Sequence, residues 1–268
     1  MKALITGASS GIGRELAKAL ASEYDELVLV ARSEDKLKEL QEEIQTNSNA
    51  KVKIYVSDVS VTENCIKLHE DNPDVDLLIN NAGFGDCGSF SETSLEKELS
   101  MINTNITAYH ILTKLYLADM KKKNSGHILN VASIAGFMPG PLMATYYATK
   151  SYVVRLSEAI REELRREKSK VKISILCPGP VETNFNKVAN VSFSFKGLSS
   201  SYVANYTIKH LNRFYIVPGS QIRLARIGSH FVPSSFVAKI VYNIQKKKIW
   251  LGDGAKSRKS DGSLFWKN

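Results

Sequence analysis

The sequence has few cysteines, and no pattern in which they would bind a metal. Its 268 residues include only Cys65, Cys87 and Cys177, which are far apart and odd in number. No C-x-x-C or H-E-x-x-H pattern occurs, and the five histidines do not cluster. These absences argue against a structural zinc site and against a disulfide framework. We therefore expect no bound metal and a reduced, intracellular setting.

Long apolar segments are also missing. No stretch of about 18 consecutive apolar residues occurs, so no helix is expected to span a membrane. The chain opens with MKALITGASSG, which reads as a strand and a turn rather than as an apolar signal region. Together these two features predict a cytoplasmic location.

Acidic charge is scarce relative to basic charge, and the excess is unevenly placed. The net charge is +9, and from Lys246 to the end there are seven Lys or Arg against two Asp. No aromatic-basic platform accompanies this charge, so nucleic acid is not expected as a partner. A solvated basic tail is the simplest interpretation, with a membrane surface or an acidic partner as the alternatives.

Seven short apolar runs recur along the chain, separated by charged, helix-like stretches. The runs are nearly continuous rather than alternating, as in strands covered on both faces. Such strand–helix alternation predicts an α/β fold with a doubly wound parallel seven-stranded sheet, the Rossmann fold, in a single domain over residues 1–250. The runs are KALIT (2–6), ELVLVA (26–31), VKIYVS (52–57), VDLLIN (75–80), HILNVA (127–132), VKISILC (171–177) and FYIVPG (214–219).

Three segments extend this plan. Residues 184–213 interrupt the last crossover, where α/β sheets build ligand pockets, and are predicted to form a substrate lid. Residues 234–248 carry an apolar stripe and predict an extra amphipathic helix, which could cover the body, contact another subunit or touch a membrane. Residues 251–268 have no periodicity and are expected to form a flexible basic tail.

A glycine-rich turn follows the first strand. In TGASSGIG (6–13), Gly7, Gly11 and Gly13 fit G-x-x-x-G-x-G, a variant of the dinucleotide fingerprint. Glycine permits a tight turn and lets backbone N–H groups approach a pyrophosphate at the start of a helix. The position between strand and helix favours cofactor binding over a plain glycine-rich corner.

The end of the second strand bears on the choice of cofactor. NAD-binding proteins usually carry an acid about 20 residues past the glycines, which binds the ribose 2′-hydroxyl. Here Ala31 stands at that position and Arg32 follows. An arginine can pair with a 2′-phosphate, so NADP(H) is favoured over NAD(H). The alternative is that Arg32 only caps or solvates the strand end.

A tyrosine and a lysine four residues apart suggest a tuned acid. Tyr146 precedes Lys150 by one helical turn, and Ser133 lies 13 residues before Tyr146. The same spacing recurs in Ser229, Tyr242 and Lys246, so spacing alone identifies nothing. Ser133 directly follows an apolar strand, where a doubly wound sheet presents its ligand crevice, whereas Ser229 does not. The context therefore favours the first set.

Taken together, the motifs resemble the short-chain dehydrogenase/reductase family, of the classical single-domain kind, over about residues 1–185. The motifs occur in the order TGASSGIG, SDV (57–59), NNAG (80–83), INTNITA (102–108), NVASIAG (130–136), YYATK (146–150) and PGPVET (178–183). One departure is Ala108, where the family often has glycine.

The resemblance implies a site residue by residue. It makes Asn105, Ser133, Tyr146 and Lys150 catalytic, with Tyr147 more suited to shaping the pocket. Asp58 would hold the adenine amine, although it could instead cap the helix that follows. The implied cofactor contacts are Gly7, Ser9, Ser10, Gly11, Ile12, Gly13, Arg32, Asp58, Val59, Asn81, Ala82, Gly83, Tyr146, Lys150, Pro178, Gly179, Val181 and Thr183.

The implied chemistry is hydride transfer with a proton relay. A free phenol has a pKa of about 10, so a nearby Lys150 ammonium is expected to lower the pKa of Tyr146. Ser133 would hold the carbonyl oxygen and Asn105 would anchor a water molecule, while the nicotinamide supplies the hydride. Lys150 would also bind the nicotinamide ribose.

The predicted function is an NADP(H)-dependent oxidoreductase that interconverts a carbonyl and a secondary alcohol. A 3-oxoacyl-[acyl-carrier-protein] reductase and a catalytically silent dinucleotide-binding sensor are the alternatives. A nucleotide-sugar epimerase fits less well, because G-x-x-G-x-x-G is missing. Phe185, Phe193, Phe195 and Tyr202 in the expected lid suit either an apolar substrate or packing of the lid. The resemblance implies a homodimer or a homotetramer.

Overall fold

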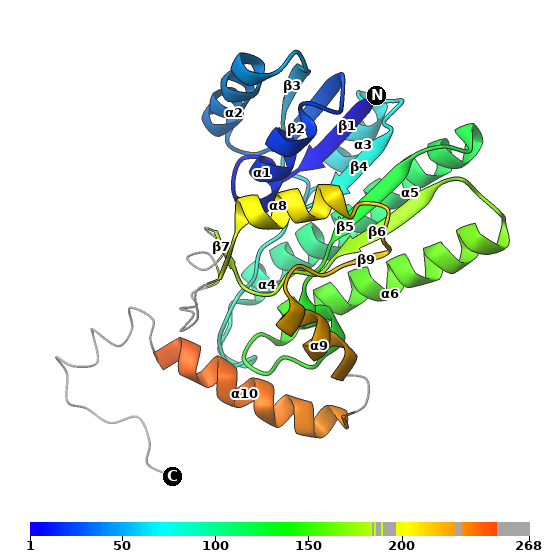
Figure 1. The fold of residues 1–268 in the computed structure, drawn as a ribbon. Coiled ribbons are helices and arrows are strands. Elements are labelled where there is room, and N and C mark those ends of the chain that lie inside the picture. Colours follow the sequence, from blue (N-terminus) through cyan, green and yellow to red (C-terminus); the bar gives the residue numbers. More distant parts are fainter. Residues whose placement is uncertain (184, 186–188, 190–196, 229–231, 251–268) are drawn as a thin grey trace, which may run out of the picture.

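The computed structural model describes residues 1–183, 185, 189, 197–228 and 232–250. It has a parallel seven-stranded sheet in the order β3-β2-β1-β4-β5-β6-β9 (Figure 1). The predicted Rossmann-type sheet is thereby confirmed, with a strand at each of the seven apolar runs. The strands are β1 (Lys2–Thr6), β2 (Glu26–Ala31), β3 (Lys51–Val56), β4 (Leu77–Asn80), β5 (His127–Val131), β6 (Lys172–Leu176) and β9 (Tyr215–Ile216).

Strands β1 and β2 are apolar after their first residue because both of their faces are buried. In β1, Ile5 packs into one core layer and Leu4 into the layer on the opposite face. In β2, Leu29 packs into the same layer as Ile5, and Val28 packs into the same layer as Leu4. Successive side chains of a strand point to opposite faces, so a strand buried on both sides favours apolar residues throughout. Buried polar side chains in the other strands, Asn80, Asn130 and Ser174, are hydrogen-bonded.

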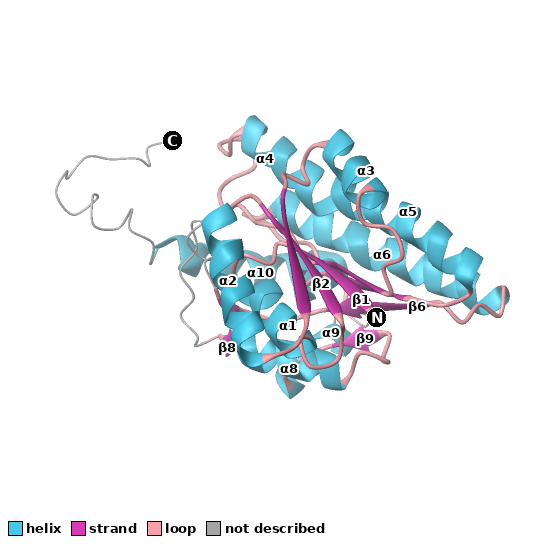
Figure 2. Ribbon diagram, turned by 90° about the horizontal axis from the view of Figure 1, so that it is seen from above, coloured by secondary structure: helices cyan, strands magenta, loops and turns pink. Residues whose placement is uncertain are grey.

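Helices cover both faces of the sheet (Figure 2). The layer that contains Ile5 includes side chains from α1 (Gly11–Leu20), α2 (Glu34–Asn47) and α8 (Ser200–Lys209). The opposite layer includes side chains from α3 (Thr62–Glu70), α5 (Ala108–Lys123) and α6 (Ala144–Arg166). Shorter elements are α4 (Leu95–Ile102), the π-helix η1 (Asn103–Thr107), the 3₁₀-helix η2 (Ile134–Phe137) and the paired strands β7 (Val181–Glu182) and β8 (Leu198–Ser199).

The second half of the expected lid belongs to the body of the domain. Residues 200–209 form α8, and its Val203 and Ala204 are buried in the same core layer as α1. This helix completes the crossover from β6 to β9 and covers the sheet. Phe193 and Phe195 of the expected lid lie outside the described residues, as does the tail 251–268.

Within the described residues, two helices follow β9. The expected extra helix is present as α10 (Ser234–Trp250), and it lies at the periphery of the molecule (Figure 1). It is preceded by α9 (Ser220–Gly228), which the sequence did not lead us to expect. Among the described residues, no helix is long and apolar enough to cross a membrane.

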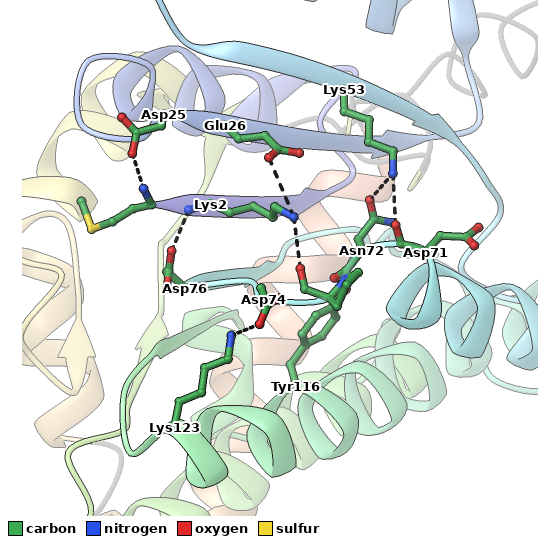
Figure 3. A network of polar contacts seen from close by, with 12 residues as sticks. Lys2, Asp25, Glu26, Lys53, Asp71, Asn72, Asp74, Asp76, Tyr116 and Lys123 are labelled. Atoms are coloured by element: carbon green, nitrogen blue, oxygen red, sulfur yellow. Dashed lines mark hydrogen bonds and ion pairs between the residues drawn. The ribbon is translucent and has the colours of Figure 1, made fainter.

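Polar contacts join the segments at the amino ends of the strands (Figure 3). The backbone N–H of Lys2 donates to Asp76 Oδ2 at 2.7 Å, and Lys53 Nζ donates to Asn72 Oδ1 at 2.7 Å. The hydroxyl of Tyr116 donates to the carbonyl of Asn72 at 3.1 Å. The site residues predicted from sequence lie at the other, carboxyl edge of the sheet.

Candidate functional site

The glycine turn after β1 has a conformation and a crowding that only glycine allows. Gly7 and Gly11 have φ angles of 68° and 58°, in the left-handed region. A Cβ added to Gly7 would lie 2.8 Å from the Cα of Ala82, and one added to Gly13 would lie 2.4 Å from the carbonyl oxygen of Gly7. The turn therefore packs backbone directly on backbone.

The turn leads into the N-terminus of α1, which suits an anion. Ser9 lies in the turn, and Ser10 precedes the helix without using its hydroxyl as a cap. The first turn, which contains Ile12, has no acidic side chain. The N–H groups and dipole at such a helix start attract negative charge. Residues 6–13 therefore fit a pyrophosphate.

The segment after β4 holds this turn in place. Asn81 donates from Nδ2 to the carbonyl oxygens of Thr6 and Gly7, at 2.9 and 3.1 Å. The backbone N–H groups of Asn81 and Ala82 both donate to Thr6 Oγ1, at 2.9 and 3.1 Å. Sequence reasoning missed Thr6, whose position as the last residue of a strand before a glycine turn was the available signal.

Arg32 and Asp58 meet where β2 and β3 end. Arg32 Nη1 lies 3.6 Å from Asp58 Oδ2, and the Arg32 side chain is 76% exposed. Asp58 Oδ1 also accepts from the backbone N–H of Ser60 at 2.9 Å, so it does stabilise the turn before α3. Partial burial opposes the charged form of Asp58, but the hydrogen bonds from Ser60 and the Arg32 charge outweigh it, so its pKa lies below the usual value. The neighbouring Val59 is buried.

The carboxyl end of β5 brings Ser133 to Tyr146. Ser133 follows the strand in extended backbone, and its Oγ accepts from the N–H of Ala135 at 3.2 Å. Tyr146 lies in the first turn of α6, and the Ser133 hydroxyl is near enough to lower the pKa of its phenol. The serine and tyrosine that were predicted to act together therefore lie in the same part of the site.

Lys150 lies beneath this pair and is almost fully buried. Its Nζ donates to the carbonyl oxygen of Val131 at 2.9 Å and lies 6.0 Å from the centroid of the Tyr146 ring. Burial lowers the pKa of Lys150 to about 8, and the nearby Cys177 thiol offsets this only in part. An amine in this position can change its charge near neutral pH.

The expected lowering of the Tyr146 pKa is not found. Burial instead raises the pKa of Tyr146 above its ordinary value, and the hydrogen bond to Ser133 opposes that rise without cancelling it. The physical reason is that removal from water penalises a phenolate, while the Lys150 amine is directed at a carbonyl oxygen. The phenol is therefore neutral at neutral pH.

Asn105 is held inside the π-helix η1, which the sequence did not predict. Its Nδ2 donates to the carbonyl of Phe84 at 2.9 Å and to Thr149 Oγ1 at 3.0 Å, and its Oδ1 accepts from the Phe84 N–H at 3.1 Å. A Cβ on Gly83 would lie 2.9 Å from that Oδ1. Ala108 is buried directly after η1, at the start of α5. Single π-turns often occur at functional sites.

An apolar wall stands beside the Tyr146 phenol. The Phe185 ring centroid lies 5.2 Å from that of Tyr146, and Met143 is buried in the same cluster. Tyr147 lies edge-on to Tyr146, and its hydroxyl accepts a hydrogen bond of 2.8 Å from Nε2 of Gln245 on α10. Sequence reasoning missed Gln245, because nothing local links it to residues almost a hundred positions earlier.

The segment after β6 lies close to both the glycine turn and Ser133. Thr183 lies beside the glycine turn, since a Cβ on Gly11 would be 3.0 Å from Thr183 Cγ2. Pro178 accepts at its carbonyl from the N–H of Ile134 at 3.0 Å, close to Ser133. Gly179 is near Ile222 of α9, and Val181 begins β7.

The structure thus gathers the predicted residues at the carboxyl edge of the sheet. The competing Tyr242 and Lys246 are exposed on α10, and Ser229 lies outside the described residues. Within the described part of the chain, no group of His, Cys, Asp or Glu side chains could hold a metal ion. A strand-end glycine turn and a cluster of Ser133, Tyr146 and the buried Lys150 define a dinucleotide-type oxidoreductase architecture.

Comparison with known proteins identifies the family. The short chain dehydrogenase family model matches residues 1–192, and the chain belongs to that family. An uncharacterized oxidoreductase of Staphylococcus saprophyticus is 35% identical over 185 residues, 68% of this chain and 78% of the relative. The ketoacyl reductase HetN of Nostoc is 35% identical over 213 residues, 77% of this chain and 73% of the relative.

Solved structures agree with this assignment. A short-chain dehydrogenase from Sphingobium yanoikuyae in complex with NADPH has a TM-score of 0.78 and 25% identity, covering 86% of this chain and 93% of its own. A short-chain dehydrogenase/reductase from Burkholderia phymatum in complex with NAD has a TM-score of 0.76 and 28% identity, covering 84% and 91%. Helices α8 to α10 lie beyond the stretch that the family model matches.

Proposed function

We propose that the protein is an NADP(H)-dependent oxidoreductase that interconverts a carbonyl and a secondary alcohol, with Tyr146 as the acid and base. The observation that carries this proposal is the buried Lys150 amine, whose Nζ lies 6.0 Å from the centroid of the Tyr146 ring at the end of β5, where Ser133 also lies. These residues lie at the carboxyl edge of the sheet, where doubly wound folds bind their ligands.

The residues of the glycine turn fit a dinucleotide, because Gly7, Gly11 and Gly13 leave the start of α1 open to a pyrophosphate. NADPH in one structural neighbour and NAD in another support a nicotinamide cofactor without deciding between the two. Arg32 supports NADP(H), since it is exposed beside Asp58 and no acid occupies position 31. When bound, this cofactor supplies the hydride.

In the direction of reduction, Tyr146 donates its phenolic proton to the carbonyl oxygen of the substrate as that oxygen gains negative charge. A neutral phenol is the form that this step requires, and burial keeps Tyr146 in it. Ser133 positions the same oxygen by a second hydrogen bond. An alkoxide is much more basic than a phenolate, so the raised pKa of Tyr146 does not prevent the transfer.

Lys150 and Asn105 support the return of the proton. A protonated Lys150 stabilises the phenolate left after transfer, and an amine with a pKa of about 8 readily exchanges its proton near neutral pH. Asn105, held by hydrogen bonds to Phe84 and Thr149, anchors a water molecule through which Lys150 exchanges its proton with solvent.

A 3-oxoacyl-[acyl-carrier-protein] reductase is the second candidate. The likeness to a ketoacyl reductase over 213 residues favours it, and it uses the same proposed chemistry on a longer substrate. The apolar wall of Met143, Phe185 and Tyr147 is compatible with an acyl chain. A catalytically silent sensor would bind the cofactor without turnover.

Turnover is the decisive test. Purified protein is titrated with NADPH, and NADPH oxidation is then followed with a panel of ketones and a 3-oxoacyl thioester. We expect oxidation that Tyr146→Phe reduces by at least a thousandfold while NADPH binding is retained. Binding of NADPH without any NADPH oxidation would favour the sensor. If neither NADPH nor NADH binds, the proposal is contradicted. The cytoplasmic location and the homodimer or homotetramer remain predictions, the latter testable by light scattering.

A further inference from the structure

The outward face of α10 combines apolar and basic side chains. Phe236, Ile240 and Ile244 are 57%, 45% and 46% exposed, and their spacing of four residues aligns them along one side of the helix. Lys239 and Lys246 are exposed beside this line. We call these five residues the α10 outer face.

The opposite face of α10 is what attaches the helix to the body. Val241 and Gln245 are buried, and Gln245 bonds to Tyr147. A groove lies between Pro141 and the α10 residues Ala238, Lys239, Tyr242 and Asn243. Packing of α10 on the domain therefore does not account for the outer face. The helix lies at the periphery of the fold, so this face is open to a partner (Figure 1).

Exposed apolar side chains are concentrated in this part of the described chain. Of fourteen large apolar side chains with high exposure, six lie between Leu224 and Ile244. Contiguous exposed apolar surface usually marks a binding surface.

Charge in the same region has a single sign. Between Glu182 and Asp253 the sequence has ten Lys or Arg and no Asp or Glu. On α10 itself the charged side chains that the structure describes, Lys239 and Lys246, are both basic and exposed, and a basic face attracts anionic partners. Two further lysines, Lys247 and Lys248, follow Lys246 directly in the sequence.

We propose that the α10 outer face docks the protein on an anionic lipid surface. A helix with large apolar side chains next to lysines lies in the plane of a bilayer interface, where the apolar groups enter the acyl boundary and the lysines bind lipid headgroups. An acidic protein would use the lysines but leave the apolar line without a partner. A second copy of this chain would bring the lysines of both copies together, which costs free energy.

The test is flotation of the full chain with vesicles of phosphatidylcholine alone or mixed with phosphatidylglycerol. We expect binding to the anionic vesicles, weaker binding at high salt and little binding to neutral ones. Phe236→Ser with Ile240→Ser should weaken binding by at least about tenfold, because each large side chain contributes roughly that factor. Lys239→Glu with Lys246→Glu should weaken it by at least about tenfold as well.

Matched controls exclude general effects of the substitutions. Leu95→Ser with Leu99→Ser removes two exposed apolar side chains four residues apart on α4, and Lys36→Glu with Lys114→Glu reverses two exposed charges elsewhere. Both controls should bind vesicles as the unmodified chain does. Retained NADPH binding shows that each variant is folded.

Several results would overturn the proposal. Failure of the unmodified chain to bind anionic vesicles would do so, as would equal binding by the α10 variants. A dimer that the α10 substitutions dissociate, without vesicle binding, would assign the face to a second copy. Binding of an acidic acyl carrier protein that depends on Lys239 and Lys246, again without vesicle binding, would assign it to a protein partner.

Discussion

Gln245 on α10 donates a hydrogen bond of 2.8 Å to the hydroxyl of Tyr147, the residue that follows Tyr146 in α6. The C-terminal helix is therefore joined directly to the wall of the candidate active site. Gln245 is only 1% exposed, and a Cβ on Gly140 would lie 2.1 Å from Cγ of Tyr147, so neither residue has room to move independently.

Substitution of Gln245 is expected to change substrate use more than chemistry. Gln245→Leu leaves the Tyr147 hydroxyl without this partner, but it also removes Oε1 of Gln245, which is buried without a hydrogen-bond partner. The net loss of stability should therefore be small, about 1 kcal/mol. Because Tyr147 forms the wall and not the proposed acid, KM should rise several-fold while kcat changes little. The double variant with Tyr147→Phe should be more stable than Gln245→Leu alone, since it removes the unsatisfied hydroxyl. If the losses of unfolding free energy in the two single variants add up to that of the double variant in urea denaturation, Gln245 and Tyr147 are not coupled.

Arg32→Ala is expected to weaken NADPH binding by roughly 10–100-fold and to leave NADH binding nearly unchanged. The reason is that a charge-assisted hydrogen bond to a 2′-phosphate contributes about 1.5–3 kcal/mol. Fluorescence titration of both cofactors measures the change. Arg32→Lys should restore part of the preference, because it keeps the charge and loses the bidentate geometry. An equal loss of affinity for NADPH and NADH would instead indicate that Arg32 acts on cofactor binding through Asp58.

Gly13→Ala is expected to abolish cofactor binding and to destabilise the fold. The added Cβ would lie 2.4 Å from the Gly7 carbonyl oxygen, so the backbone of the glycine turn must shift. Gly228→Ala is the matched control, because a Cβ there meets nothing within 4 Å. That control should bind cofactor normally. A Gly13→Ala protein with unchanged cofactor affinity and Tm would show that the turn can relax.

Thr6→Val tests the hydrogen bonds between Thr6, at the end of β1, and the segment that follows β4. The Oγ1 atom of Thr6 accepts from two backbone N–H groups, those of Asn81 and Ala82. Valine keeps the shape and leaves both donors without that acceptor, so stability should fall by roughly 2–4 kcal/mol in urea denaturation. Thr6→Ser keeps the oxygen and should lose much less. Similar losses in both variants would show that the methyl group matters more than the hydrogen bonds.

Lys150 is expected to make stability depend on pH. Its pKa is lowered from 10.5 to about 8, so between those values the folded state binds fewer protons than the unfolded state. Stability therefore rises with pH across this window. Lys150→Met should remove that rise, which amounts to roughly 1–2 kcal/mol between pH 8 and 9.5. Urea denaturation of both proteins at several pH values measures the difference. Parallel curves would mean that Lys150 keeps an ordinary pKa.

Much of the fold was readable from the sequence because it depends on local patterns. The seven apolar runs became the seven strands, and the extra helix expected over residues 234–248 is α10. The burial of β1 and β2 on both faces follows from their continuous apolar character. By contrast, the sequence predicted that α8 belongs to a lid. Ser200, Ser201 and Asn205 make its composition polar, and the few residues that it buries do not stand out in the sequence.

The sequence by itself determined which groups meet at the site. Glycines at fixed spacing require the turn, and Ser133 and Tyr146 are positioned by the strand that ends just before Ser133 and by the helix that contains Tyr146. Only the tertiary structure decided how those groups behave. The burial that raises the pKa of Tyr146 and lowers that of Lys150, the π-helix around Asn105 and the bond from Gln245 to Tyr147 all depend on packing between distant segments. Local pattern encodes backbone geometry, whereas desolvation and long-range contacts exist only once the layers have assembled.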